Sequence, residues 1–409
     1  MSEADWPLSY ERDPRSAGQD GPRAKRDRMV AGCMTGTSID ALDVAVVRIS
    51  GTGLAMRAEL AAFHSEPLGE LAGVLRRLAS GEALTASEIA DAAWALGERH
   101  ADAITRALAA RHPDLVCVHG QTVMHAPTAT RTALESGATR TPARGRTWQL
   151  LQPAPIAARF SCPVVFDLRA LDVALGGQGA PITPIADWIL CRSPDRTRAI
   201  VNLGGFANAT ILPADLGPDA IRGFDICACN QLLDAIARAR LGAAFDRDGR
   251  AAAAGIVHAD LLDSFTRLLE QQARAGRSLG SGDELAECVL LSTHISAPDV
   301  ARTACEAVGG VIGRVLASRP PPHRVQEVYL AGGGAFNPVL AAAIARAAGA
   351  PCQPLDVLGV PVQAREAMCF AVLGALCQDR VPITLSSVTG VPSPSPVSGA
   401  WCFPPASRA

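Results

Sequence analysis

Lysine is almost absent from this 409-residue sequence, in which Lys25 is the only lysine among 38 lysine and arginine residues. A P-loop needs the pattern G-x-x-x-x-G-K-[ST], whose lysine reaches the β- and γ-phosphates of a nucleotide. Lys25 lies instead in a charged stretch that glycine and proline interrupt. The sequence therefore excludes a P-loop enzyme.

Long apolar runs are also missing, since no segment reaches the roughly 18 apolar residues of a membrane-spanning helix. Residues 1–28 balance six acidic against six basic side chains and lack the apolar centre of a signal peptide. We therefore expect a disordered leader over 1–28, no membrane contact and a cytoplasmic protein.

The chain has little excess of charge and no paired cysteine motif. Its net charge is only −2, which creates no field that would attract nucleic acid, so we expect no nucleic-acid partner. The twelve cysteines include no C-x-x-C pair. Such cysteines are typical of small buried side chains in a reducing compartment.

Apolar patterning predicts strands alternating with helices, and the chain length suits two domains. In the first part, β-rich runs at 29–34 and 42–50 predict an antiparallel hairpin, and an alanine- and leucine-rich region at 68–111 predicts helices. Two further strands, at 114–120 and 162–169, end in polar residues, and the polar segment 126–147 predicts a loop.

The second part begins with another β-rich hairpin and repeats this order. We expect the hairpin at 199–212, helices over 231–316, a strand in "EVYLAGGG" and a helix that begins near Asn337. The Ser/Pro-rich tail from "PITLSSV" onward should lack regular structure. Two hairpin-led halves suggest an α/β protein whose lobes face a cleft.

The turn of the first hairpin, "GCMTGTSIDALD" at 32–43, has the composition of a phosphate site. Gly36 would let backbone N–H groups face an anion, Thr37 and Ser38 would add donors, and Asp40 and Asp43 could hold hydrated Mg²⁺. The alternative is an ordinary turn in which Ser and Asp satisfy backbone donors.

Two more glycine-rich turns could complete a nucleotide site. Gly204 and Gly205 in the second hairpin could face the same anion, and Gly332–Gly334 before Asn337 would let the backbone pass close to a nucleotide. Each could instead be a plain tight turn, and the G-x-G-x-x-G spacing of dinucleotide folds is absent.

Polar residues follow two of the predicted strands, at the sheet edge where α/β proteins bind ligands. A lone histidine is often a satisfied core residue, and the spacing matches no common zinc pattern. The residues concerned are His119, Gln121 and His125 after the first strand, and Asp167, Arg169 and Asp172 after the second.

Two further carboxylates stand at predicted element ends. Asp225 in "RGFDICACN" would lie between a strand and a helix, where it could accept a proton during phosphoryl transfer or simply cap the helix. Glu366 in "QAREAMCFAVLG" would lie at the start of an apolar helix, as a ligand or as a charge that complements the helix dipole.

Taken in order, these motifs resemble the anhydro-N-acetylmuramic acid kinase family of the actin/hexokinase/sugar-kinase superfamily. The resemblance covers the chain from about residue 29 to the tail. It is carried by the segments "GTSIDALDVAVV", "HGQTVMH", "FDLRALDVALGGQGAP", "NLGGFANAT", "GFD…N…LLDA", "FDRDGRAAAAG", "GGGAFNP" and "EAMCFA".

The resemblance implies two actin/hexokinase-like (ribonuclease H-like) domains with mixed sheets that face an interdomain cleft. The N-terminal lobe would be 29–195, with 375–409 packing back onto it, and the C-terminal lobe 196–374. It further implies an ATP- and Mg²⁺-dependent enzyme of peptidoglycan recycling, in many members a homodimer. Such enzymes open 1,6-anhydro-N-acetylmuramic acid hydrolytically and phosphorylate O6, giving N-acetylmuramic acid 6-phosphate and ADP.

The resemblance also implies roles for individual residues. Asp225 corresponds to the base that activates water, and Asp40 and Asp43 would hold the metal. The ATP site would comprise Gly36, Thr37, Ser38, Ile39, Asp40, Ala41, Leu42 and Asp43, with Gly204, Gly205, Gly332, Gly333, Gly334 and Asn337. The sugar site would comprise His125, Asp167, Arg169 and Glu366.

Some segments depart from the family pattern. Ile226–Cys229 replaces a Thr-Gly-Pro-Gly-like turn, which leaves open a non-catalytic nucleotide- or sugar-binding protein. The altered segments "TWQLLQP" and "RSLGSG" leave open another sugar acceptor. The sequence does not decide between one chain and a dimer.

Overall fold

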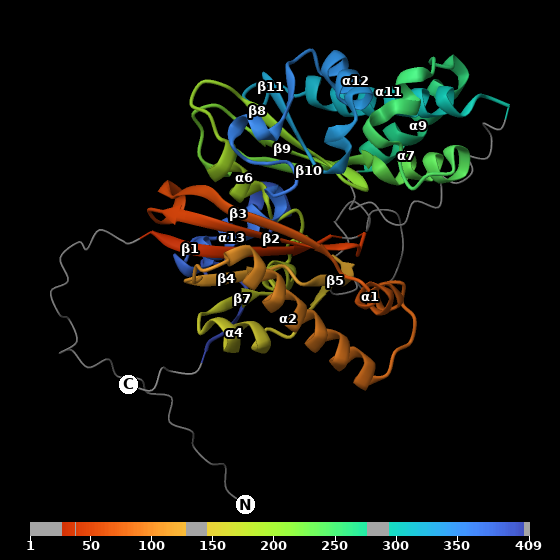
Figure 1. The fold of residues 1–409 in the computed structure, drawn as a ribbon. Helices are drawn as coiled ribbons and strands as arrows, with labels where there is room; N and C mark the ends of the chain where they lie inside the picture. The colour runs from red at the N-terminus through yellow and green to blue at the C-terminus, as the bar shows by residue number, and fades with distance from the viewer. Residues whose placement is uncertain (1–26, 37, 128–144, 276–293, 405–409) are drawn as a thin grey trace, which may run out of the picture.

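The computed structural model describes residues 27–36, 38–127, 145–275 and 294–404. Figure 1 shows two α/β lobes, one above the other, each built on its own sheet. Both sheets mix parallel and antiparallel pairs, so the predicted fold class of two lobes with mixed sheets is confirmed. Residues 1–26 of the predicted leader and 128–144 of the predicted 126–147 loop lie outside the described residues. Arg28 begins a strand, and the described ends of the loop reach into two strands, so both predicted boundaries are slightly wrong.

The N-terminal lobe contains a six-stranded sheet in the order β13-β7-β4-β1-β2-β3 and a small two-stranded sheet, β5-β6. β1 and β2 form the antiparallel hairpin that the sequence predicted, and β4 pairs in parallel with β1. Its strands are β1 (Arg28–Thr35), β2 (Ala41–Ser50), β3 (Arg57–Pro67), β4 (Leu115–Val118), β5 (Gln121–Ala126), β6 (Arg146–Leu150), β7 (Val164–Phe166) and β13 (Ala400–Cys402), and its helices are α1 (Leu71–Ala79), α2 (Ala86–Leu108), α4 (Ala154–Phe160) and α5 (Ala170–Ala174). The next helix, α6 (Pro184–Cys191), lies between the lobes, beneath the C-terminal sheet in Figure 1.

The C-terminal lobe contains a five-stranded sheet in the order β10-β9-β8-β11-β12. β8 and β9 form the second predicted hairpin, and β11 pairs in parallel with β8. Its strands are β8 (Arg198–Leu203), β9 (Phe206–Leu212), β10 (Arg222–Ala228), β11 (Glu327–Ala331) and β12 (Cys352–Pro354), and its helices are α7 (Asn230–Ile236), α8 (Arg250–Ala254), α9 (Ala259–Ala275), α11 (Ala297–Ala317) and α12 (Pro338–Ala348).

Local signals explain where the helices begin. Thr85 and Glu88 form a capping box at the start of α2, in which each side chain bonds the other residue's backbone N–H. Asn337 caps α12, with Pro338 at the first helical position, and α12 ends at Gly349 in the left-handed conformation that glycine favours.

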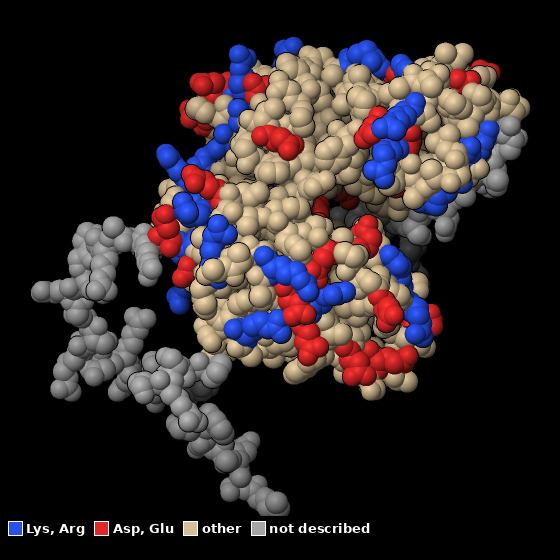
Figure 2. Space-filling model, viewed as in Figure 1, with Lys and Arg blue, Asp and Glu red and all other residues tan. Residues whose placement is uncertain are grey.

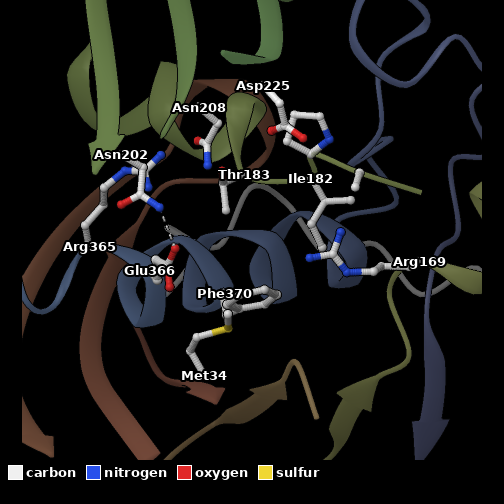
Figure 3. Close-up of a pocket in the computed structure, with 12 residues that line it drawn as sticks. Met34, Arg169, Ile182, Thr183, Asn202, Asn208, Asp225, Arg365, Glu366 and Phe370 are labelled. Atoms are coloured by element: carbon white, nitrogen blue, oxygen red, sulfur yellow. Dashed lines mark hydrogen bonds between the residues drawn. The ribbon is translucent and has the colours of Figure 1, made fainter. Parts of the chain in front are cut away.

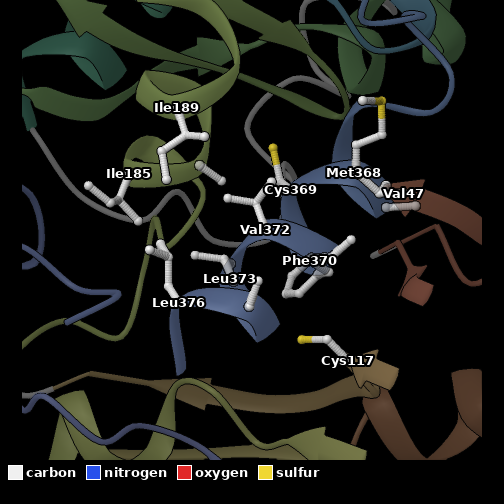
Figure 4. Packing of buried hydrophobic residues seen from close by; sticks show 14 of the residues in the cluster. Val47, Cys117, Ile185, Ile189, Met368, Cys369, Phe370, Val372, Leu373 and Leu376 are labelled. Carbon is white, nitrogen blue, oxygen red and sulfur yellow. The ribbon is translucent and has the colours of Figure 1, made fainter. Parts of the chain in front are cut away.

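Three apolar clusters hold the lobes together in layers. Successive β1 residues point to opposite faces of the sheet, so Ala31 packs toward α1, α2 and α4 while Val30 packs toward α13 (Arg365–Gln378). The cluster around α13 also contains Ile200 and Tyr329 from the C-terminal sheet. α13 therefore lies between the two sheets and joins their cores. Figure 4 shows its side chains packed between Val47 and Cys117 of the N-terminal sheet and Ile185 and Ile189 of α6.

α13 approaches the N-terminal sheet closely because two contact points are glycines. A Cβ on Gly32 of β1 would lie 2.1 Å from the Ala367 carbonyl oxygen, and one on Gly374 would lie 2.5 Å from the Cys117 Cβ. The chain thus returns to the N-terminal sheet at the start of α13. The sequence analysis set this return at residue 375, ten residues later than the structure has it.

The tail carries more regular structure than we expected from its Ser/Pro content. A short helix, α14 (Ser386–Thr389), precedes β13, which pairs antiparallel with β7 at the edge of the sheet. The prediction of an irregular tail is therefore wrong for these segments. β13 is only three residues long and gains its ladder from a distant strand, so its own sequence carried little signal.

Candidate functional site

A cavity of about 160 Å³ lies between the lobes. Figure 2 shows a hollow at the junction of the lobes with acidic side chains at its edge, and basic and acidic side chains interspersed over this face. Figure 3 shows side chains from both lobes turned into the cavity. Its lining comprises Met34, Arg169, Ala180, Pro181, Ile182, Thr183, Asn202, Asn208, Asp225, Arg365, Glu366 and Phe370.

Three polar residues form a row across the C-terminal sheet at one side of the cavity. Asn202 of β8 is opposite Asn208 of β9, which is opposite Asp225 of β10. Residues directly opposite each other on neighbouring strands share a face of the sheet. The fold therefore presents two amides and one carboxylate side by side.

Asp225 lies inside β10, which we had expected to end before it. A bulge follows Asp225 in the pairing with β9, and the strand then continues through the buried segment Ile226–Ala228. The alternative role of Asp225 as a helix cap is excluded, because α7 begins at Asn230 with Cys229 as its N-cap residue.

The environment of Asp225 suits a base that works near neutral pH. Burial raises the pKa of its carboxyl to about 6, against the opposing effect of the Arg169 guanidinium. A base is most effective when its pKa lies near the working pH, where it is ionised and still holds a proton well.

Arg169 faces Asp225 from the N-terminal lobe. Its Nε donates to His119 Nε2 at 3.0 Å, and its Nη1 donates to the Gly179 carbonyl at 2.7 Å. Burial lowers the pKa of Arg169 to about 10, while the carboxylates of Glu366, Asp225 and Asp172 raise it. Arg169 therefore remains a cation at neutral pH, within the field of those three carboxylates.

Glu366 joins the two lobes at the cavity. It lies in the first turn of α13, and its Oε1 accepts a hydrogen bond from Asn202 Nδ2 at 3.1 Å. The dashed line in Figure 3 marks this contact. Its role is thus more than complementing the helix dipole, because the side chain is aimed at the opposite lobe.

The first hairpin ends in a tight turn close to this cavity. Thr37 lies outside the described residues. Ser38 Oγ donates to Asp40 Oδ1 at 2.6 Å, and the Ala41 N–H donates to the same oxygen at 2.9 Å, as the ordinary-turn interpretation required. Ile39 and Leu42 are buried in the lobe's core, so their side chains do not face a ligand.

The carboxylates near this turn suit a divalent cation. Burial raises the pKa of Asp43, a Ser65 hydrogen bond lowers it, and the nearby charges of Glu366 and Asp40 raise it further. Clustered carboxylates are the ligands that Mg²⁺ prefers, and it usually takes only one or two of them together with phosphate oxygens and water. Within the described residues, no group of three or more His, Cys, Asp and Glu side chains could hold a metal ion.

The other two glycine-rich turns lie against each other. Gly332 has φ +76, and a Cβ there would lie 2.7 Å from Asn202 Oδ1 and 2.8 Å from the Leu203 carbonyl oxygen. Asn230 Nδ2 also donates to the Leu203 carbonyl, at 2.9 Å. The turn Gly332–Gly334 is therefore packed onto the second hairpin, beside the row that contains Asp225.

Known proteins resemble this chain over nearly its whole length. The sequence model of the anhydro-N-acetylmuramic acid kinase family matches residues 28–402. The chain belongs to the anhydro-N-acetylmuramic acid kinase family. The enzyme of that name from Salinibacter ruber is 34% identical over 90% of this chain and 95% of its own, and that from Acidiphilium cryptum is 33% identical over 89% and 95%.

The solved structures that match this chain have much lower sequence identity to it than the relatives above. Component A of the Acidaminococcus fermentans (R)-2-hydroxyglutaryl-CoA dehydratase covers 85% of this chain and 98% of its own, with 14% identity and a TM-score of 0.43. A ROK family glucokinase from Streptomyces griseus has 14% identity and a TM-score of 0.36, covering 85% of this chain and 97% of its own. Likeness at this level says nothing about function.

Membership of the anhydro-N-acetylmuramic acid kinase family makes this chain a kinase, and so a nucleotide-binding protein that acts on a small-molecule substrate. In the described segments, no helix is both long and apolar enough to cross a membrane. Of the residues predicted for the kinase site, Arg169, Asp225 and Glu366 meet at one cavity.

Other predicted residues lie elsewhere. His125 Nδ1 contacts Thr147 Oγ1 at 3.0 Å, and neither His125 nor Asp167 lines the cavity. Burial, and then the charge of Arg169, lower the pKa of His125 to about 4. Asp167 has φ +51 just before α5, and burial raises its pKa while the Ala170 N–H lowers it. Both residues therefore lie beside Arg169 rather than in the cavity.

Asn337 differs most from its expected role. Its Oδ1 accepts from the N–H groups of Val339 and Leu340, its Nδ2 donates to Cys305 Sγ at 3.4 Å, and it is 9% exposed. The side chain is therefore occupied by the helix cap and is not available to a nucleoside.

The sequence analysis missed Arg365 as a residue of the cavity wall. Its guanidinium forms a buried ion pair with Asp187 of α6, with Nε to Oδ1 at 2.9 Å and Nη2 to Oδ2 at 2.5 Å, and Thr210 Oγ1 donates to the same carboxylate at 3.0 Å. The pair ties α6 and α13 to β9. The only signal in the sequence was the pair Arg365–Glu366 at the start of α13, of which the sequence analysis considered only Glu366.

Proposed function

We propose that this kinase opens the 1,6-anhydro ring of anhydro-N-acetylmuramic acid with water and phosphorylates O6, giving N-acetylmuramic acid 6-phosphate and ADP during peptidoglycan recycling. One observation carries the proposal. The Asp225 carboxylate faces an interlobe cavity opposite the Arg169 guanidinium, with a pKa that burial raises to about 6. The family membership supports the choice of substrate.

Asp225 would act as the base in the ring-opening step. It would take one proton from water as the water oxygen bonds to the anomeric carbon C1. The bond from C1 to O6 then breaks, O6 takes the γ-phosphoryl group, and ADP leaves. Positioning and charge neutralisation supply most of the acceleration in such transfers, which fits a cavity lined by a fixed cation and fixed amides.

The lining residues of the cavity suggest how the sugar is held. Asn202 and Asn208 present amides beside the base, and Glu366 offers a carboxylate oxygen on the other side. Amides and carboxylates are suitable partners for sugar hydroxyls. Arg169 would offset negative charge as the proton and phosphoryl group move.

The glycine-rich turns suggest the nucleotide site. Backbone N–H groups of Gly36–Asp43 and of Gly204–Gly205 would approach the phosphates, and Gly332–Gly334 would pass the nucleoside. Asp40 and Asp43 would hold Mg²⁺, which neutralises charge on the phosphates when bound. On this assignment, Asp43→Asn should raise the Mg²⁺ concentration needed for half-maximal activity, and an unchanged requirement would remove Asp43 from the metal site.

The test is to incubate the purified protein with Mg-ATP and 1,6-anhydro-N-acetylmuramic acid. We expect ADP and 6-phosphosugar in equal amounts, with Asp225→Asn inactive and Asp195→Asn, on the exposed α6–β8 connection, fully active. No product at high enzyme concentration rejects the proposal. A panel of sugar acceptors and binding calorimetry then distinguishes a different acceptor from binding without turnover.

A further inference from the structure

The guanidinium of Arg169 is held by two neutral acceptors, although the charges of three carboxylates act on it. His119 Nε2 and the Gly179 carbonyl accept its hydrogen bonds, while Arg169 makes no ion pair with Glu366, Asp225 or Asp172 in the described part of the chain. A cation among carboxylates would normally move onto one of them. Something in the fold must therefore hold it in place.

Hydrogen-bond chemistry determines the state of the His119 ring. Its Nδ1 lies 2.7 Å from the Gly120 carbonyl oxygen, which can only accept, so Nδ1 carries the hydrogen. Its Nε2 lies 3.0 Å from Arg169 Nε, which can only donate, so Nε2 offers a lone pair. Both contacts exist together only in the neutral Nδ1–H tautomer.

The surroundings keep the ring neutral and fixed. Burial, and next the charge of Arg169, lower the pKa of His119 to about 3, while the Gly120 contact opposes them. The ring packs against Phe370 of α13 at 4.9 Å between centroids. Thr35 Oγ1, at the end of β1, also donates to the Gly120 carbonyl, at 3.1 Å.

We propose that His119 is a positioning residue, whose neutral ring holds Arg169 in the cavity opposite Asp225 without an ion pair forming. The inference rests on the proposed role of Asp225 for its kinetic test, but the ring state can be tested without turnover. The alternative is a purely structural role, in which His119 is a core histidine whose removal only loosens the packing.

Two substitutions separate these roles. His119→Gln can place its amide oxygen near the position of Nε2, where it accepts from Arg169, whereas His119→Asn is too short to do so. We expect His119→Asn to lower kcat by about 10- to 100-fold, as small misplacements of a positioned group do, and His119→Gln to recover most of that loss. Equal losses in both variants would contradict the positioning role.

A double-mutant cycle with Arg169→Gln distinguishes the positioning role from a loss of packing. If His119 acts through Arg169, His119→Asn should lower activity far less in the Arg169→Gln background than in the wild type. It should also move the acid limb of kcat/KM to higher pH, since a displaced cation no longer lowers the pKa of Asp225. Additive effects with an unmoved limb would overturn the proposal.

Nitrogen NMR of the histidine rings in the wild-type protein provides a test that does not depend on activity. We expect the His119 ring to stay in the neutral Nδ1–H form down to about pH 5, with its signal assigned through its loss in His119→Gln. A ring that protonates near pH 6.5, or that carries its hydrogen on Nε2, rejects the proposal. Failure of the sugar assay alone would leave this result unaffected and would reject only the proposed function.

Discussion

Replacing Asp225 by asparagine should abolish turnover and also make the unliganded protein more stable at neutral pH. A carboxyl whose pKa is raised on folding favours the folded state only while it is protonated. That stability is fully present below the unfolded pKa, near 3.8, and is lost as the pH rises through the folded pKa of about 6. Asparagine has a similar shape and never ionises, so it avoids this loss.

The size of the effect follows from the pKa change. The pKa of Asp225 is raised from 3.8 to about 6, and one pKa unit corresponds to about 1.4 kcal/mol. The upper bound at pH 8 is therefore about 3 kcal/mol. Since the carboxylate borders a cavity that admits water, we expect a gain of about 1 to 3 kcal/mol, which falls by about half at pH 5 and vanishes below pH 3.8.

The assay is chemical denaturation of the wild type and of Asp225→Asn at pH 8 and pH 5, with Asp195→Asn as the matched control on an exposed loop. The control should match the wild type at both values. An Asp225→Asn protein that is no more stable than the wild type at pH 8 would refute the claim that Asp225 is held as a desolvated base.

Three further outcomes follow from the site. The pH profile of kcat/KM should have an acid limb with an apparent pKa of about 6, from the burial of Asp225, and a limb near pH 4 would indicate a solvated carboxyl. Asp187→Ala should lower the free energy of unfolding by about 3 to 5 kcal/mol, because it leaves Arg365 buried without its partner; a change under about 1 kcal/mol by urea titration would contradict this. Gly332→Ala should raise the KM for ATP, because a φ of +76 disfavours a side chain and its Cβ would lie 2.8 Å from the Leu203 carbonyl oxygen, so that the turn must shift; an unchanged KM for ATP would argue against a nucleotide role for this turn.

Much of the fold followed from local patterns in the sequence. β-rich runs on either side of a short turn predicted both hairpins, because pairing between neighbouring segments depends on residues close in sequence. The start of α12 could also be predicted from the sequence, since an asparagine before Pro338 is a typical beginning of a helix.

The remaining features depend on contacts between distant segments. The pair of Asp187 and Arg365 joins residues 178 positions apart, and no pattern around either residue names its partner. β13 pairs with β7 in the same way, across most of the chain. The neutral partner of Arg169 was likewise hidden, since His119 lies 50 residues earlier and was noticed only as a polar residue after a strand.

The central claim, that Asp225 directs water to the anomeric carbon while O6 takes the phosphoryl group, is tested most directly in ¹⁸O-labelled water. A single turnover with Mg-ATP and the anhydro sugar should place one ¹⁸O at C1 and none in the phosphoryl group, beyond the exchange measured when finished product is kept in the same water. Label in the phosphoryl group, or an unlabelled sugar, would contradict the claim.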